Sequence, residues 1–402
     1  MYAMEANVSK YTNAIGSGKQ AMTQRQKRKG GGGMREGWEY KKLGDSRVIE
    51  YGTRVVQKKD GGTIYPVYGG GGETFRMDKY NRENCLVVAR FAMSRTCVRY
   101  VTGKFFLNDS GLSINAGKEL LQSYLNHHIL HLNDDIYNLG KGAAQRNLDV
   151  NSFRNLIIAI PPLSTQLSIV SELDKINELI SLKKEQLKDY DNLAQSIFYE
   201  MFGDPVVKEK GWEIKKLGEV SMIKTGPFGS MLHKEDYITG GIPLINPMHI
   251  QNFKAVPDKD FSISKEKAAE LCNYQLKIND VIFARRGDIG RCAVISDKEA
   301  GCLCGTGSLF VRFERKLSSI YTMYVVRTTS FIKELVSKAK GATMLNLNSS
   351  TMENLRFPIP PLPLQQLFAQ RIELIEKQKA EVQRTIADLE TLLASRMQYW
   401  FD

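Results

Sequence analysis

The sequence lacks the patterns that mark several large protein classes. Its six cysteines among 402 residues include no Cys-x-x-Cys pair, so neither a zinc ribbon nor a disulfide scaffold is expected. Cys302 and Cys304 have no second pair at zinc-finger spacing. No run of 18 apolar residues occurs, and the N-terminus has no apolar signal region. We therefore expect reduced thiols, no membrane span and a cytoplasmic location.

Catalytic and cofactor motifs are also missing. An adenine methyltransferase uses Asn/Asp-Pro-Pro-Tyr/Phe around the flipped base, but the segments nearest to it are Ile-Pro-Pro-Leu and Asn246-Pro247-Met248-His249. Gly69–Gly72 has no acidic Rossmann partner and is interpreted as a flexible loop or turn. Gly16-Ser17-Gly18-Lys19 has Asn13 and Gln20 where a phosphate loop needs Gly and Ser/Thr. We predict no catalytic residue and no cofactor.

The histidines do not form a recognisable zinc motif. His127 and His131 are four residues apart, but His128 replaces the glutamate of a zinc metalloprotease helix. We interpret the three histidines as an exposed helix face and predict no metal site.

Positive charge is abundant. Fifty-six Lys and Arg against 44 Asp and Glu give a net charge of +12 and a pI near 9.2. Such an excess favours a polyanionic partner, because neutralised phosphates release condensed counterions. The same excess could instead only keep the protein soluble, so net charge does not decide between a nucleic-acid partner and solubility.

The sequence contains an internal repeat. The opening Gly37–Asp45 (GWEYKKLGD) returns as Gly211–Glu219 (GWEIKKLGE). Farther on, the paired segments share one offset: Lys141-Gly142-Ala143 with Lys340-Gly341-Ala342, Asn147-Leu148 with Asn346-Leu347, and Ile160–Leu163 with Ile359–Leu362 (IPPL). The openings lie 174 residues apart (37 to 211) and the endings 199 apart (160 to 359), so the second copy is about 25 residues longer. This ordered repetition indicates two related domains.

Each copy has the same predicted order of elements. Buried strands are expected at Leu86–Ala89 and Asp280–Ala284, and helices at Lys118–Leu132 and Ser318–Lys338. Pro-Pro then breaks the chain and leads into a new helix.

A heptad seam follows each Pro-Pro. Its positions alternate by four and three residues: Ile169, Leu173, Ile176, Ile180, Lys183, Leu187, Tyr190, Ala194, Ile197 and Met201. Adding 199 gives the second seam: Phe368, Ile372, Ile375, Lys379, Val382, Ile386, Leu389, Leu393, Arg396 and Trp400. Two matched helices of about 38 residues favour antiparallel pairing with each other over packing on their own domains. A rod of roughly 57 Å would result, with one globular part at each end.

These features resemble the specificity subunit of Type I restriction-modification systems. The resemblance is carried by the paired openings, the two Lys-Gly-Ala segments, the two IPPL segments and the helix end Phe198–Pro205, and it covers about residues 37–402. It implies an α+β fold in which two long antiparallel coiled-coil helices separate two target recognition domains, as a pseudo-twofold repeat. The expected domain boundaries are 1–36 (disordered basic extension), 37–160 (first recognition domain), 161–205 (central helix), 206–358 (second recognition domain) and 359–402 (C-terminal helix).

The resemblance also implies a function. Each domain would read one half of a bipartite, asymmetric site in double-stranded DNA, and the helices would set the spacer. Modification subunits carrying S-adenosylmethionine and ATP-dependent restriction subunits would be the partners. Leu182 and Leu193, outside the seam, are candidates for the docking surface.

Basic residues after the predicted strands are the candidate DNA contacts. Arginine and lysine bind phosphates and read base edges. The candidates are Arg90, Arg95, Lys141, Arg285, Arg286, Arg291 and Lys340. The second loop contains Gly287 and Gly290, whereas the first lacks these glycines, which leaves its geometry open. A solvated basic turn is the alternative for each residue.

Residues 1–36 differ from the rest. Gln24–Lys29 is strongly basic and runs into glycines, which indicates a disordered arm that grips DNA. Alternatively, Met34 is the authentic start.

Two other functions remain open at this point. The chain could be a coiled-coil adaptor that does not read DNA, or the recognition part of a fused restriction-methylation enzyme. Sequence-dependent DNA affinity would exclude the adaptor.

Overall fold

A computed structural model describes residues 35–402 except 144, 288, 314–316 and 340–345. The chain divides into two compact units, one formed by residues up to Leu187 together with Glu381–Asp402 and the other by Lys188–Ala380. The basic arm, the Gly16–Lys19 segment, Met34 and Lys340 lie outside the described residues.

The globular part of the first unit is a twisted sheet with short helices. Its elements are β1 (Glu39–Lys42), α2 (Leu43–Ser46), β2 (Arg47–Tyr51), α3 (Gln57–Asp60), β3 (Tyr65–Tyr68), β4 (Glu73–Met77), β5 (Arg82–Ala89), β6 (Val98–Leu107), β7 (Gly111–Ala116), α4 (Gln122–His131), α5 (Asn133–Asn138), β8 (Gly140–Lys141), β9 (Asn147–Leu148), α6 (Val150–Arg154) and β10 (Ile157–Ile160). Six strands form one sheet in the order β2-β7-β5-β6-β3-β4, where only β3 and β6 pair in parallel.

The globular part of the second unit contains two four-stranded sheets. Its elements are β11 (Glu213–Lys216), η1 (Leu217–Glu219), β12 (Ser221–Thr225), η2 (Gly229–Met231), η3 (Lys234–Asp236), β13 (Tyr237–Ile238), β14 (Ile242–Ile245), η4 (Pro247–His249), β15 (Ile250–Gln251), β16 (Lys254–Ala255), β17 (Ser262–Ile263), α8 (Lys265–Glu270), η5 (Cys272–Tyr274), β18 (Val281–Ala284), β19 (Cys292–Val294), β20 (Leu303–Cys304), β21 (Ser308–Phe313), α9 (Ser319–Arg327), α10 (Thr329–Lys338), α11 (Ser349–Glu353) and β22 (Arg356–Ile359). The sheets run β12-β21-β18-β19 and β13-β17-β14-β20.

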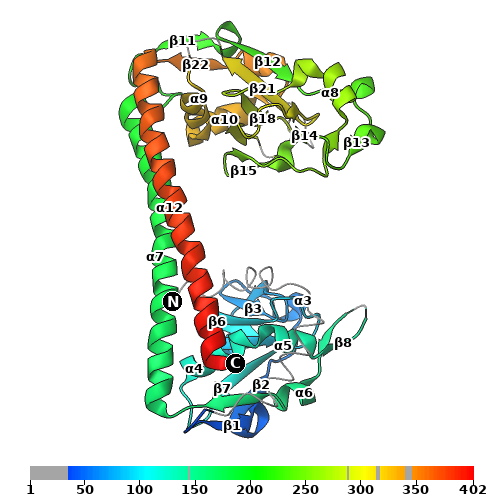
Figure 1. The fold of residues 1–402 in the computed structure, drawn as a ribbon, viewed down its shortest axis with the longest axis vertical. Helices are drawn as coiled ribbons and strands as arrows, with labels where there is room; N and C mark the ends of the chain where they lie inside the picture. The colour runs from blue at the N-terminus through cyan, green and yellow to red at the C-terminus, as the bar shows by residue number, and fades with distance from the viewer. Residues whose placement is uncertain (1–34, 144, 288, 314–316, 340–345) are drawn as a thin grey trace. The chain divides into compact units, whose positions relative to one another are not determined.

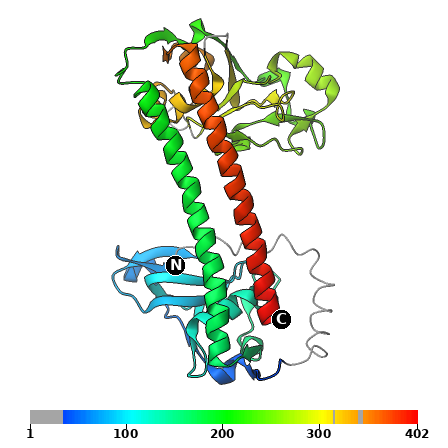
Figure 2. The ribbon, with the colours of Figure 1, turned by 60° about the vertical axis from the view of Figure 1, so that its left-hand side comes forward.

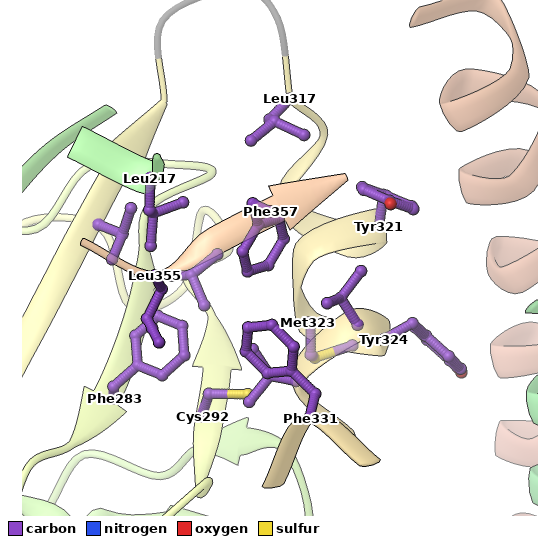
Figure 3. Packing of buried hydrophobic residues seen from close by; sticks show 14 of the residues in the cluster. Leu217, Phe283, Cys292, Leu317, Tyr321, Met323, Tyr324, Phe331, Leu355 and Phe357 are labelled. Carbon is purple, nitrogen blue, oxygen red and sulfur yellow. The ribbon is translucent and has the colours of Figure 1, made fainter. Parts of the chain in front are cut away.

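An apolar core joins the sheet, α9, α10 and the long helices of the second unit. Cys292 on the sheet lies close to Met323 of α9 and Phe331 of α10 (Figure 3), and Tyr321 of α9 packs on Phe198 and Phe202 of the first long helix. All of these side chains are at least nine-tenths buried. At about 25 cal/mol per Å² of apolar surface removed from water, side chains of this size each contribute roughly 1.5–3 kcal/mol.

Helices α7 (Leu163–Phe202) and α12 (Leu362–Phe401) are each 40 residues long. In the first unit Glu172 pairs with Arg396 and Lys184 with Glu390. In the second unit Asp191 pairs with Lys379 at 2.9 Å and Phe198 packs on Phe368. Because partner numbers rise on one helix as they fall on the other, the helices run antiparallel in each unit (Figure 1, Figure 2). The predicted antiparallel pair is therefore confirmed. Apolar seam positions line the contact and are almost fully buried: Ile169, Leu173, Ile176, Ile180, Ala194, Phe368, Ile372, Ile375, Val382, Ile386 and Leu393.

The sequence repeat is a structural repeat. Each GWExKKLG opening forms a strand that pairs antiparallel with the strand before Pro-Pro: Glu39–Lys42 with Ile157–Ile160, and Glu213–Lys216 with Arg356–Ile359. The paired strands lead directly into α7 and α12 (Figure 1). We call this two-stranded element, with the turn into the long helix, the joint.

A buried glutamine fixes each joint. Gln166 accepts a hydrogen bond from the Leu121 amide at 2.8 Å and donates to the carbonyls of Glu119 and Pro161 at 2.9 and 2.8 Å. Gln365, 199 residues later, accepts from the Ser318 amide at 2.8 Å and donates to the Pro360 carbonyl at 2.8 Å. Both side chains are fully buried. They satisfy backbone groups that Pro-Pro and the helix start would otherwise leave unpaired.

Two predictions about local structure need correction. The predicted helix Ser318–Lys338 is two helices, because the Thr328 hydroxyl accepts a hydrogen bond from Phe331 and caps α10. Likewise, Lys118–Leu132 starts later, at Gln122, and the chain continues into the separate helix α5.

The histidines of α4 do not form an exposed face. His127 and His128 are each only 2% exposed. His127 Nε2 lies 2.8 Å from Asp174 Oδ1 of α7, and the His128 ring stacks on Phe401 of α12 at 4.6 Å between centroids. The interpretation was wrong because the polar face of α4 packs against the long helices. Within the described ranges, no three His, Cys, Asp or Glu side chains gather as a metal site would require.

None of the helices in the described part of the chain has both the length and the apolar character that a membrane crossing requires.

Candidate nucleic-acid interface

The two candidate arginine loops leave equivalent strands. Arg90 follows β5 and Arg285 follows β18. The carbonyl of Arg90 accepts a hydrogen bond from the Leu148 amide, and that of Arg285 from the Leu347 amide, each at 2.8 Å. The repeated Asn-Leu pair therefore holds the start of each loop, and the loops correspond in space within their own units.

The backbone of the two loops also corresponds. Two residues after the strand-end arginine, Ala92 has φ +48° and Gly287 has φ +76°. The left-handed conformation is easy for glycine but strained for alanine. In the first unit Asn147 Oδ1 accepts a hydrogen bond from the Ala92 amide at 3.2 Å. This contact resolves the open question of the glycine-free loop, because alanine takes the glycine conformation and a side chain holds it there.

The Gly69–Gly72 segment is a tight turn between β3 and β4 that packs against the first loop. A Cβ on Gly70 would lie 2.4 Å from the Phe91 carbonyl oxygen, so only glycine fits. The Gly70 carbonyl accepts a hydrogen bond from Arg99 Nη2 at 2.8 Å. The sequence predicted a flexible loop or a turn for Gly69–Gly72, and the structure has a turn.

Arginines of the first loop lie over aromatic rings. The Arg90 guanidinium carbon is 4.5 Å from the centroid of Phe91 and 5.0 Å from that of Tyr51. Arg95 lies 4.8 Å from the ring of Tyr137 in α5. Stacking orders a guanidinium and leaves its N–H edge available to an acceptor.

A third arginine joins this group. Arg146, in the connection between β8 and β9, lies 4.7 Å from the same Tyr137 ring and donates to the Gly140 carbonyl at 3.1 Å. Its own carbonyl accepts from the Met93 amide at 2.9 Å. Neither Arg146 nor Tyr137 was predicted from the sequence. Their one sequence signal is that both flank Lys141, itself a candidate.

Lys141 lies on the β8–β9 hairpin, which projects from the first unit (Figure 1). Its side chain is 78% exposed, and its Nζ lies 2.5 Å from Asp149 Oδ2. Asp149 also caps α6 by accepting from the Asn151 and Ser152 amides. The hydrogen bonds from Lys141 and then Ser152 lower the pKa of Asp149 to about 2. Lys141 is therefore accessible but already paired with a carboxylate.

In the second unit the candidates differ in exposure. Arg286 is exposed, while Arg285 and Arg291 are half-buried. Arg285 Nε donates to Asn346 Oδ1 at 3.2 Å. Burial, and then the charge of Arg286, lowers the pKa of the Arg285 guanidinium. The structure thus brings Arg285 to the repeated Asn-Leu segment, as it does Arg90.

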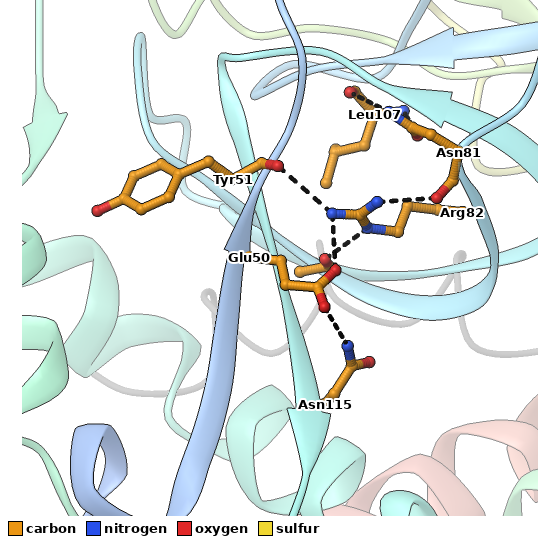
Figure 4. A network of polar contacts seen from close by, with 7 residues as sticks. Glu50, Tyr51, Asn81, Arg82, Leu107 and Asn115 are labelled. Atoms are coloured by element: carbon orange, nitrogen blue, oxygen red, sulfur yellow. Dashed lines mark hydrogen bonds and ion pairs between the residues drawn. The ribbon is translucent and has the colours of Figure 1, made fainter.

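Other arginines form ion pairs within the fold. Arg82 lies among Glu50, Ser113 and backbone carbonyls on the first sheet (Figure 4), with Nη2 2.9 Å from Glu50 Oε2 and Nε donating to Ser113 Oγ at 2.8 Å. Arg312 makes two hydrogen bonds, at 2.8 and 2.6 Å, to the buried carboxylate of Asp280. Their charges are neutralised by neighbouring carboxylates, which separates them from the arginines over aromatic rings.

The buried cysteines are not reactive groups. Burial raises the pKa of the thiols of Cys85 and Cys302 to about 11 and of Cys97 and Cys292 to about 12. Thiols in this state stay protonated near neutral pH and are poor nucleophiles and metal ligands.

Comparison with known proteins decides the family. The model of the family described as "Type I restriction modification DNA specificity domain" matches residues 35–189 and again 209–391. The chain belongs to this family. Both matches include one joint and part of one long helix, so the family unit coincides with the structural repeat.

Curated relatives agree. The MjaIX specificity subunit of a Type I restriction enzyme from Methanocaldococcus jannaschii is 23% identical over 269 residues, or 61% of this chain and 60% of the relative. A putative Type I specificity subunit from Haemophilus influenzae is 23% identical over 322 residues, which cover 77% of this chain and 80% of the relative. This chain spans 60% and 64% of the length of two M. jannaschii relatives that it matches.

Solved structures share the fold. The S subunit of a Type I restriction-modification system from M. genitalium matches with a TM-score of 0.53 at 15% identity, covering 91% of this chain and 96% of that one. A chain from a study of complex assembly and conformational transition in the Type I system matches with a TM-score of 0.57 at 19% identity. The match covers 91% of this chain and 98% of that one.

Proposed function

We propose that this chain is the DNA-specificity subunit of a Type I restriction-modification complex, in which each globular domain reads one half of a bipartite, asymmetric site. The observation that carries the proposal is the repeated joint. In each unit that carries a joint, the repeated Asn-Leu pair also holds an arginine-bearing loop at the end of a strand. The sheets that carry the two loops differ in strand number and order. Two like frames with unlike surfaces suit two different half-sites.

The chain itself supplies recognition and no catalysis in this proposal. Modification subunits carrying S-adenosylmethionine would methylate adenine, and ATP-dependent restriction subunits would cut. The described arginines carry charge and planar donors for double-stranded DNA, and the buried thiols offer no nucleophile.

The helices α7 and α12 would set the spacer between half-sites and dock the modification subunits. Forty residues at 1.5 Å each give about 60 Å, or at most roughly 18 base pairs at 3.4 Å. Leu182 and Leu193, the docking candidates, are 53% and 47% exposed on α7. Exposed leucines on a helix whose seam is already filled are suited to a protein partner.

Individual contacts and domain limits remain part of the proposal. We assign DNA contact to the predicted set: Arg90, Arg95, Lys141, Arg285, Arg286, Arg291 and Lys340. The first recognition domain is proposed as 37–160 and the second as 206–358.

Methylation mapping tests the proposal. The chain is expressed with candidate modification subunits, assembly is verified, and methylated adenines are mapped across the host genome by single-molecule sequencing. We expect a split motif with two defined halves and a fixed gap. Absence of methylation from an assembled complex supplied with S-adenosylmethionine would contradict it.

A further inference from the structure

The first unit concentrates positive charge on one aromatic ring. Arg95 and Arg146 come from different segments, the loop after β5 and the β8–β9 connection, yet both guanidinium groups lie within 5 Å of the Tyr137 centroid. Two like charges repel, so their approach to one ring needs a compensating attraction. The electron-rich face of Tyr137 provides it.

Neither arginine is neutralised. Among the described residues, Arg95 and Arg146 have no carboxylate partner within ion-pair distance, unlike Arg82 beside Glu50 and Arg312 beside Asp280. Arg95 is exposed, whereas Nε of Arg146 is buried and its Nη2 already donates to the Gly140 carbonyl. Both groups add positive charge around the ring, which suits an anion or base-edge acceptors, and Arg95 offers the open N–H edge.

The backbone around the ring is held firmly. Asn133 of α5 is 6% exposed, its Nδ2 donates to the Arg95 carbonyl at 2.8 Å, and its Oδ1 accepts from the Val98 amide at 3.1 Å. The helix that carries Tyr137 therefore also clamps the loop that carries Arg95. These hydrogen bonds tie the ring and the loop together, which should lower the entropy lost when Arg95 binds a ligand.

We propose that Tyr137 is a positioning residue for recognition of the first half-site, holding Arg95 so that its planar N–H edge faces base acceptors in the DNA groove, while Arg146 on the same ring adds positive charge. The inference rests on the proposed function and deepens it. Arginine reads guanine through two parallel hydrogen bonds, which demand a fixed plane. Tyr137 fixes that plane without using the N–H edge.

The second unit gives an internal comparison. There the strand-end Arg285 is oriented by an amide oxygen, Asn346 Oδ1, instead of an aromatic ring. A change at Tyr137 should therefore affect only the half-site that the first domain reads.

The test uses the full chain in its assembled complex, with methylation mapping as the measurement. Tyr137→Leu should lower methylation of sites with the correct first half about tenfold relative to sites with one wrong base there. The second half should keep its stringency. Tyr137→Phe keeps the ring and should restore the wild-type motif, which a requirement for the hydroxyl would not allow.

Two further variants sharpen the result. Arg95→Lys keeps the charge but removes the planar fork, so it should relax one position of the first half. Tyr80→Leu is the matched control, because Tyr80 is an exposed tyrosine of the same unit with the Lys104 ammonium 4.7 Å from its ring. We expect Tyr80→Leu to leave the motif unchanged.

The outcomes separate this inference from the proposed function. If the wild-type complex yields no split motif, the proposed function fails and the inference fails with it. If the wild type yields a split motif but Tyr137→Leu leaves the first half as stringent as before, only the inference fails. Equal loss of methylation at all sites, or equal relaxation of both halves, also overturns it, because either would indicate a general structural or phosphate-binding role.

Discussion

The two units are alike where they join the long helices and unlike where they present their sheets. Both joints pair the GWExKKLG strand with the strand before Pro-Pro, and both hold the turn with a buried glutamine, Gln166 or Gln365. The first unit then builds one six-stranded sheet, whereas the second builds two sheets of four. Residues that recur at a constant offset therefore form the frame, and residues that do not recur form the surface that differs.

The loops show the same division on a smaller scale. The strand-end arginine carbonyl is held by the repeated leucine amide in both units, but the side chains are oriented by aromatic rings in the first and by Asn346 in the second. A common backbone with different side-chain support would allow the two proposed half-sites to diverge independently.

Domain exchange should produce the largest effect. Replacing residues 37–158 with the matching domain of a relative should change one half of the methylated motif completely and leave the other half and the gap unchanged. Methylation mapping reads both halves at once. Replacing 211–357 is the reciprocal control and should change only the other half; a change in both halves from either exchange would show that the units do not read independently.

Lengthening the helix pair should move the half-sites apart. We propose one inserted heptad after Lys184 in α7 and one before Glu390 in α12, at the level where these two side chains pair at 3.0 Å. Seven residues add about 10 Å, so the gap should grow by about three base pairs. Insertion into one helix alone is the control and should disrupt the seam. An unchanged gap after the double insertion would remove the role of the helices as a ruler.

The glutamines should contribute equally to stability if the joints are equivalent. Gln166→Leu or Gln365→Leu leaves buried backbone groups without partners and should each lower the free energy of unfolding by about 2–4 kcal/mol. Urea denaturation measures both. Gln366→Leu is the matched control, since Gln366 is exposed next to Gln365 and should change stability by less than about 0.5 kcal/mol. A large effect at only one joint would break the equivalence.

The loop residues Ala92 and Gly287 should respond in opposite directions. Ala92→Gly relieves a left-handed alanine and should stabilise by about 0.5–1 kcal/mol, whereas Gly287→Ala should destabilise by about 1 kcal/mol. Thermal denaturation of both variants measures the difference. Neither a contact nor a positive φ restricts Gly71, so Gly71→Ala should have little effect. Equal signs for the two loop variants would contradict the correspondence of the loops.

Much of the fold was predictable from local pattern. The two 40-residue helices follow from seams that alternate by four and three residues, because this period places apolar side chains on one face whatever surrounds them. The constant 199-residue offset fixed their equivalence. The predicted strand Leu86–Ala89 is the end of β5 (Arg82–Ala89), and the predicted strand Asp280–Ala284 matches β18 (Val281–Ala284) except at its first residue, because short apolar β-branched runs bury well.

The remaining features depend on contacts between distant residues. The α4 histidines had a polar appearance, yet Asp174 and Phe401 bury them, and neither partner is near α4 in sequence. Gln166 and Gln365 looked like ordinary helix residues until their backbone partners were placed.

What the sequence by itself determined is the duplicated architecture, the long paired helices and the excess of positive charge, because periodicity, repetition and composition are properties of the chain alone. What only the tertiary structure decided is which charges remain available. Arg82 and Arg95 are equivalent in composition, but folding brings Glu50 to the first and Tyr137 to the second. A carboxylate neutralises a guanidinium while a ring only orients it, and that physical difference separates a structural arginine from a candidate for reading DNA.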